Sequence, residues 1–121
     1  MNISLELVDD GYGLQVQSGN HSMMLDASQD IGGNDRGMRP LSLMLVSLAG
    51  CSSMDILYVL RKGRHEVRSY KATVHATRRD EHPRIFNGIT LRIEVQTSAP
   101  DAVLARAAEL TRTKYCSAFA I

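Results

Sequence analysis

The sequence predicts an α+β fold in which antiparallel strands surround one long central helix. Three observations predict it: apolar and polar residues alternate over 1–26, a strongly apolar helical stretch covers 40–62, and a second alternating region at 66–97 precedes a helical pattern at 99–112. Alternation with a period of two is typical of a half-buried strand, whereas spacings of three and four indicate a helix. Strands that come in groups, separated by helices, favour α+β architecture.

Composition places the chain among small folded proteins. Its 121 residues suit a single domain, and the net charge of +1 gives no general attraction to nucleic acid or to anionic membranes. We expect neither a signal peptide nor a lipid anchor, because the N-terminus has no long apolar run. Asp55 and four serines argue against a membrane-spanning role for the helix at 40–62. We therefore expect a cytoplasmic protein whose cysteines are thiols or redox-active groups.

The N-terminal region predicts short strands joined by turns. Ile3, Leu5 and Leu7 share one side of the first strand, and Gly19-Asn20 is typical of a two-residue hairpin. The segment 26–38 lacks periodicity and is rich in turn-forming residues, so we expect a loop that leads into the central helix.

The central helix is predicted from its two ends. Pro40 suits a first helical turn, Gly63 suits the position just past the end, and Arg61 with Lys62 oppose the negative end of the helix dipole. Apolar residues surround most of this helix, which is typical of a helix buried on nearly every side. A chain this short has too few residues to bury such a helix on every side. We therefore expect a second copy of the chain to cover the remaining surface of the helix.

The C-terminal half predicts two strands and two helices. Gly88 to Gln96 alternates most clearly, and Ser98 to Asp101 resembles a capping box that opens the helix at 99–112. An apolar pattern resumes over 115–121, where we expect the start of a last helix.

Cys51 and Cys116 are the candidate reactive residues. No histidine lies near either cysteine in the sequence, so we expect no metal site. One interpretation is that both are small buried apolar residues. The other is a peroxidatic thiolate with a resolving thiol, in which the first sulfur is oxidised to a sulfenic acid that condenses with the second to a disulfide.

Two motifs carry a resemblance to a known family. The central helix contains Pro40-x-x-Leu43-Met44-Leu45 and Leu48-Ala49-Gly50-Cys51-Ser52-Ser53-Met54-Asp55, and the second motif is Glu109-Leu110-Thr111-Arg112-Thr113-Lys114-Tyr115-Cys116-Ser117. Both resemble the signatures of the OsmC/Ohr family. Further similarity over 60–64 and 78–86 resembles its YhfA-like branch.

The resemblance implies an activity and an assembly. It implies an intertwined homodimer that reduces organic hydroperoxides with a thiol reductant and no cofactor, with Cys51 attacking and Cys116 resolving. We expect the thiol pocket to be apolar, with core packing as the simpler alternative for the same side chains. The candidate pocket residues are Met44, Ser47, Met54 and Tyr115.

The sequence departs from the peroxidase members of that family at two places. Leu41 and Ser42 stand where those members carry a glutamate, and no arginine or lysine precedes Arg36. Arg36 or Arg39 could replace the arginine that stabilises the thiolate. The departures also support an alternative, a non-catalytic or redox-sensing dimer that binds an apolar small molecule in the same pocket.

Overall fold

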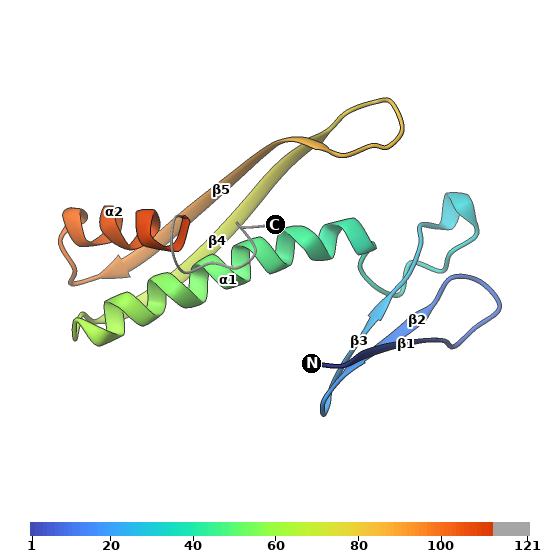
Figure 1. Cartoon of the computed structure of the whole chain (residues 1–121), viewed down its shortest axis with the longest axis horizontal. Helices are drawn as coiled ribbons and strands as arrows, with labels where there is room; N and C mark the ends of the chain where they lie inside the picture. Colours follow the sequence, from blue (N-terminus) through green and yellow to red (C-terminus); the bar gives the residue numbers. More distant parts are fainter. Residues whose placement is uncertain (113–121) are drawn as a thin grey trace. The chain divides into compact units, whose positions relative to one another are not determined.

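The computed structural model describes residues 1–112, which belong to two compact units divided after Met44. Figure 1 shows the elements in chain order. They are β1 (Ile3–Leu7), β2 (Leu14–Ser18), β3 (His21–Leu25), the short 3₁₀ helix η1 (Gln29–Ile31), α1 (Pro40–Lys62), β4 (Val67–Arg78), β5 (Phe86–Thr97) and α2 (Asp101–Leu110). The α+β fold class with two antiparallel sheets and a long helix is confirmed.

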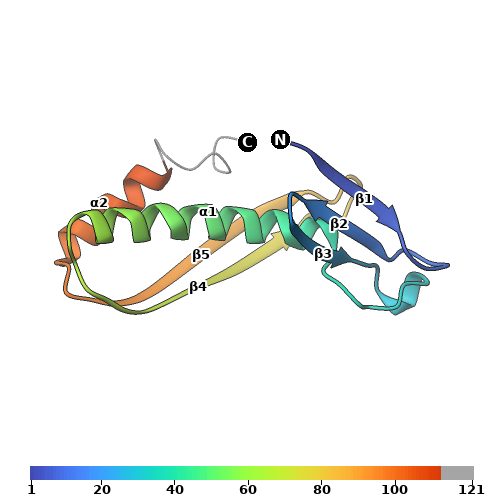
Figure 2. The same ribbon diagram turned by 90° about the horizontal axis from the view of Figure 1, so that it is seen from below.

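The N-terminal unit is built on the antiparallel sheet β1-β2-β3 (Figure 2). Leu5 pairs with Val16, which pairs with Met23, so apolar side chains line one face of all three strands. The turn at Gly19 has a φ of 60°, a left-handed conformation that glycine adopts without a steric cost. The predicted hairpin is therefore present, and β1 leaves Ile3 and Leu5 more than half exposed.

The loop after β3 is held by a buried carboxylate. Asp26 is 2% exposed and accepts hydrogen bonds from the backbone N–H groups of Ala27 and Arg36. The loop crosses the end of β3 so closely that a Cβ on Gly37 would overlap the carbonyl of Met24. This close approach leaves room only for glycine at position 37.

Helix α1 covers the range that Pro40 and Gly63 predict, but its burial within one chain is incomplete. Only Ser52, Ile56 and Leu60 are buried, whereas Met54 is 74% exposed. The expectation of burial on nearly every side is therefore not met by the described part of one chain. The physical reason is the shortage of covering material, since one sheet and one short helix pack against only part of the surface of α1.

By length and composition alone, α1 could also cross a membrane. Its most apolar 18-residue window has a mean hydropathy of 1.8, and 17% of that window is buried. The hydroxyls of Ser52 and Ser53 donate to backbone carbonyls of the preceding turn, which reduces their polarity. The C-terminal half of α1, however, packs against a sheet and a second helix, as core helices of small folds do.

The C-terminal unit places both helices on one face of the β4–β5 ribbon (Figure 2). Its core consists of Ile56, Leu60 and Ala107, each at most 2% exposed. Side chains from β4, β5 and α2 pack around this core. These are Val67, Tyr70, Ile93, Val95, Ala99, Val103 and Leu104, with Val59 of α1 itself.

The predicted capping box at Ser98 is wrong. Helix α2 begins after Pro100, and no side chain caps its N-terminus. The Oγ atom of Ser98 instead accepts a hydrogen bond of 2.8 Å from the backbone N–H of Glu66, and the Ser98 N–H donates to the Glu66 carbonyl. The side chain of Ser98 therefore binds the backbone just before β4 and does not cap α2 as the local pattern had predicted.

Candidate functional site

Cys51 lies in the fourth turn of α1 and is half-buried. Met44, Ser47, Cys51 and Met54 follow one another at spacings of three and four, which brings them onto one stripe of the helix. We call these four residues the thiol stripe. Met44 is 56% exposed and Met54 is 74% exposed, while Cys51 is half-buried. The structure therefore groups the three described candidates for the pocket with the thiol, on a surface that is open in one chain.

Helix α2 is joined to α1 one turn after Cys51. The hydroxyl of Thr111, at the end of α2, donates a hydrogen bond of 2.8 Å to Oδ2 of Asp55. Thr111 is 4% exposed and Asp55 is half-buried, so this polar contact is partly shielded from water. The predicted site residues Cys116 and Tyr115 follow Thr111 in the sequence and lie outside the described residues, as does the helix expected at 115–121.

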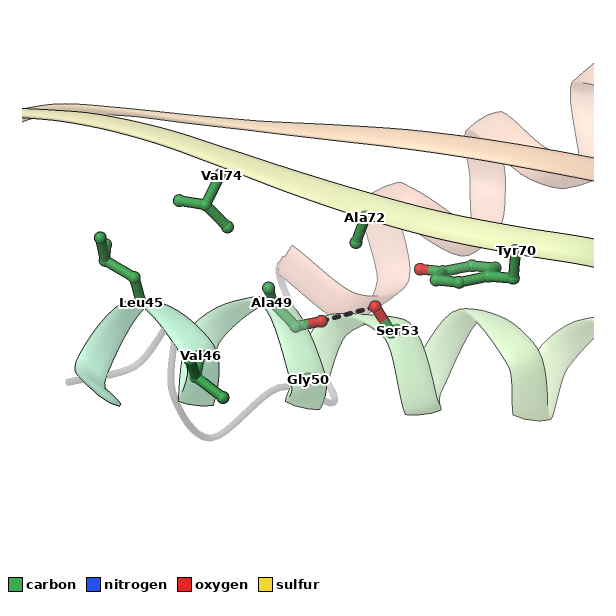
Figure 3. A pocket seen from close by; sticks show the side chains of 8 residues that line it. All are labelled: Leu45, Val46, Ala49, Gly50, Ser53, Tyr70, Ala72 and Val74. Carbon is green, nitrogen blue, oxygen red and sulfur yellow. Dashed lines mark hydrogen bonds between the residues drawn. The ribbon is translucent and has the colours of Figure 1, made fainter. Parts of the chain in front are cut away.

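A second feature of the C-terminal unit is an open groove between α1 and β4. Its volume is about 490 Å³, and Figure 3 shows the side chains that line it. They are Leu45, Val46, Ala49, Gly50 and Ser53 from α1, and Tyr70, Ala72 and Val74 from β4. Small side chains at Ala49, Gly50 and Ala72 leave the space between helix and strand unfilled. None of the thiol stripe residues lines this groove, because the stripe faces another side of the same helix.

Tyr70 and Ser53 supply the hydroxyl groups of the groove. The ring of Tyr70 lies between β4 and α1, with the hydroxyl directed toward the part of the groove near Ser53 and Ala72 (Figure 3). That hydroxyl is buried and has no hydrogen-bond partner among the described residues. Burial raises the pKa of Tyr70, and the nearby Ser53 hydroxyl acts in the opposite direction. Tyr70 is therefore neutral at physiological pH.

The two candidate arginines are both bound to carboxylates in the N-terminal unit. Arg36 forms an ion pair of 2.8 Å with Asp9, whose pKa is lowered first by the backbone N–H of Gly11 and then by Arg36. Arg39 pairs with Asp35 at 2.8 Å and donates to the Gly37 carbonyl. Each arginine is thus oriented by a carboxylate of the N-terminal unit.

Sequence reasoning did not identify the groove or the contact at Thr111. The sequence pattern marks one face of β4, which carries Tyr70, Ala72 and Val74. The space between that face and α1, however, depends on small residues of α1. Asp55 and Thr111 are 56 positions apart, and no local pattern links them. Within residues 1–112, no group of three His, Cys, Asp or Glu side chains is placed to hold a metal ion.

Solved structures share this fold. The crystal structure of a hypothetical protein from Aquifex aeolicus matches 98% of this chain and 83% of its own, with 28% identity and a TM-score of 0.85. An organic hydroperoxide resistance protein from Legionella pneumophila, at 14% identity, matches 98% of this chain and 85% of its own with a TM-score of 0.60. At this low identity, the similarity to the Legionella pneumophila protein shows only that the two chains share a fold.

Sequence comparison identifies the family. The model of the OsmC-like protein family matches residues 32–121. Protein YhfA of Escherichia coli K12 is 34% identical over 98 residues, which cover 80% of this chain and 70% of YhfA. The family match includes both cysteine motifs and all of α1. The chain therefore belongs to the family of OsmC-like proteins.

Proposed function

We propose that this protein reduces organic hydroperoxides at the expense of thiols, with Cys51 as the peroxidatic residue and Cys116 as the resolving residue. The observation that carries the proposal is the place of Cys51, half-buried in an apolar stripe of the longest helix. Methionine side chains beside a thiol offer an adaptable apolar surface to the organic part of a hydroperoxide. The fold is shared with a protein named for organic hydroperoxide resistance.

The reaction runs in three balanced steps. The Cys51 thiolate attacks one peroxide oxygen, so that an S–O bond forms, the O–O bond breaks and the alkoxide leaves as an alcohol after taking a proton. The Cys116 thiol then attacks the sulfenic sulfur, forming a disulfide and releasing water. A dithiol reductant finally exchanges with this disulfide, is itself oxidised by two electrons, and returns both cysteines to thiols.

A homodimer is part of the proposal. Two surfaces of one chain are apolar and uncovered, the thiol stripe of α1 and the β1–β3 face that carries Ile3 and Leu5. A monomer seldom leaves such surfaces in water, whereas a second copy of the chain can cover them. We therefore assign the second copy as the occupant, and no membrane or nucleic-acid partner enters the proposal. A cytoplasmic location suits it, because reduced thiols there can regenerate the cysteines.

The decisive experiment measures peroxide consumption by the full chain. With cumene hydroperoxide and dithiothreitol, we expect multiple turnovers by the wild type and none by Cys51→Ser. Without dithiothreitol, Cys116→Ser should still consume one equivalent of peroxide, because it retains the attacking thiol. Equal turnover by Cys51→Ser and the wild type, with matching circular dichroism spectra, would reject the assignment of Cys51.

A second candidate function is a non-catalytic or redox-sensing protein that binds an apolar molecule. The ion pairs of Arg36 with Asp9 and of Arg39 with Asp35 favour it, because part of the charge of each guanidinium is neutralised there. Leu41 and Ser42 in place of the family's glutamate favour it as well. Alkylation of Cys51 at the rate of an ordinary thiol, together with a co-purifying apolar ligand, would support this function over the first.

A further inference from the structure

We propose that the groove between α1 and β4 binds a neutral aliphatic molecule with one terminal hydroxyl group, of which a straight-chain alcohol is the simplest example. The hydroxyls of Tyr70 and Ser53 hold the polar end of this ligand, and the aliphatic side chains of the groove hold its chain. The groove lies on another side of α1 from the thiol stripe. The inference therefore does not rest on the peroxidase reaction.

The groove has the dimensions of a small-molecule site. Its volume of about 490 Å³ falls within the range of roughly 300–1,000 Å³ that is usual for ligand pockets. From Leu45 to Ser53 its wall on α1 covers eight positions, or about 12 Å. From Tyr70 to Val74 its wall on β4 covers four positions, or about 13 Å. Both walls match an extended alkyl chain of about eight carbons, whose carbon–carbon bonds measure about 1.5 Å.

The side chains that line the groove favour an uncharged ligand. Among the described residues that line it, Tyr70 is the only ionisable one, and burial raises its pKa. The largest of the other side chains are aliphatic, namely Leu45, Val46 and Val74. A carboxylate or an ammonium group would lose its hydration there without meeting an opposite charge. An alkyl chain, in contrast, is stabilised when it leaves water for such a surface.

Two hydroxyl groups form the polar end of the groove. The Ser53 hydroxyl donates to the Ala49 carbonyl at 2.6 Å, so its oxygen can still accept a hydrogen bond (Figure 3). The Tyr70 hydroxyl is buried, has no hydrogen-bond partner within residues 1–112, and can donate. An alcohol complements both groups, because its oxygen accepts from Tyr70 and its own O–H donates to Ser53. Such a ligand removes the free-energy cost of a buried hydroxyl without a partner.

Gly50 also favours an occupant from outside the described chain. A glycine within a helix is less favourable than alanine, because it loses more conformational entropy on folding. A Cβ atom on Gly50 would meet no other atom within 4 Å in the described part of the chain. Packing within residues 1–112 therefore does not require glycine at this position. A ligand in the groove, however, passes close to the backbone of α1 there and needs the space.

The test measures binding of 1-octanol to the purified full chain by isothermal titration calorimetry. We expect the wild type to bind 1-octanol, and to bind octanoate, which is charged at neutral pH, about tenfold more weakly. Tyr70→Phe removes only the hydroxyl and should weaken 1-octanol binding about fivefold. Ala72→Leu fills the groove and should abolish binding. Tyr12→Phe and Ala105→Leu make the same changes at exposed sites, and both should bind as the wild type does.

A stability measurement separates a ligand-binding hydroxyl from a structural one. Without ligand, Tyr70→Phe should leave the urea midpoint unchanged or raise it, because it removes a buried group that has no partner within the described residues. A lower midpoint would show that the hydroxyl has a partner in the protein and would reject its role in binding. Should Ala72→Leu fail to fold, Gly50→Ala adds a methyl group where the described chain leaves room, and it should also weaken binding.

The outcomes distinguish the groove from other sites and other occupants. Equal binding of 1-octanol by the wild type, Tyr70→Phe and Ala72→Leu would place the alcohol elsewhere and overturn the proposal. A wild type that binds no 1-octanol would overturn it too, and dissociation of a dimer by Ala72→Leu would then identify a second copy as the occupant. Cys51→Ser should bind 1-octanol as the wild type does, so failure of the peroxidase reaction leaves this test intact.

Discussion

At the scale of single residues, two carboxylates organise the N-terminal unit without taking part in the proposed chemistry. Asp26 is buried, which by itself raises its pKa, but the backbone N–H groups of Ala27, Arg36 and Asn34 outweigh that effect and lower it. The pKa of Asp9 is lowered by the backbone N–H of Gly11 and then by Arg36. Both carboxylates therefore stabilise the fold in their ionised form.

These shifts predict an acid sensitivity with a definite sign. The folded-state pKa of each group lies below the ordinary value of 3.8, so the stabilisation is present above that value and is lost as the pH falls through the folded pKa. Urea unfolding followed by circular dichroism should show a falling midpoint below pH 4. Asp26→Asn should lower the midpoint at pH 7 and flatten this dependence, whereas the exposed Asp10→Asn should leave both unchanged.

At the scale of elements, the different sides of α1 contact different parts of the molecule: one side packs into the core, one borders the groove and one carries the thiol stripe. Ile56 and Leu60 pack into the core, Ala49 and Ser53 border the groove, and Cys51 lies on the thiol stripe. A helix that is apolar all round can present a core side and reactive surfaces at once, provided that other molecules cover the rest. This explains why the apolar pattern of α1 shows no single stripe.

The core side of α1 predicts a strong effect of truncation. Leu60→Ala removes a side chain that is fully buried, and it should lower the free energy of unfolding by about 2–5 kcal/mol. Ile85→Ala, at a residue that is 55% exposed before β5, should change it by less than about 1 kcal/mol. Urea titration at pH 7 provides the comparison. Similar losses in the two variants would contradict the core described for the C-terminal unit.

At the scale of the whole molecule, one chain leaves surfaces that its described residues do not cover. Val8 and Leu7 of the N-terminal region are 45% and 55% exposed, and Tyr58, which continues the thiol stripe, is 62% exposed. These apolar groups belong to two separate compact units. Assembly with a second copy is the physical solution that we propose.

The homodimer has a direct test in solution. Light scattering should give twice the chain mass of 13.4 kDa for the wild type. Met54→Glu places a charge at a position that is 74% exposed in one chain, so it should dissociate a dimer while hardly changing the stability of a monomer. Thr73→Lys, on the outer side of β4, should stay dimeric. A wild type with the mass of one chain would contradict the assembly.

Interactions between neighbouring residues made the bounds of α1 and the first hairpin predictable from the sequence. Pro40, Gly63 and the charges between them indicate the bounds of α1, and Gly19-Asn20 indicates the first hairpin, because caps and turns depend on a few neighbouring residues. The cysteine motifs indicated the family, which the comparisons confirm. The assignment of Cys51 and Cys116 to catalysis stays a prediction.

What the sequence determined by itself was therefore the order of the strands and of the two long helices within residues 1–112, and the family. Only the tertiary structure decided that the thiol stripe and the groove lie on different sides of α1, that Ser98 binds Glu66, and that Thr111 binds Asp55. The physical reason is the distance along the sequence over which each kind of interaction acts. Helix and turn propensities act over a few residues, whereas contacts between residues 32 or 56 positions apart arise only when packing of the whole core brings their elements together.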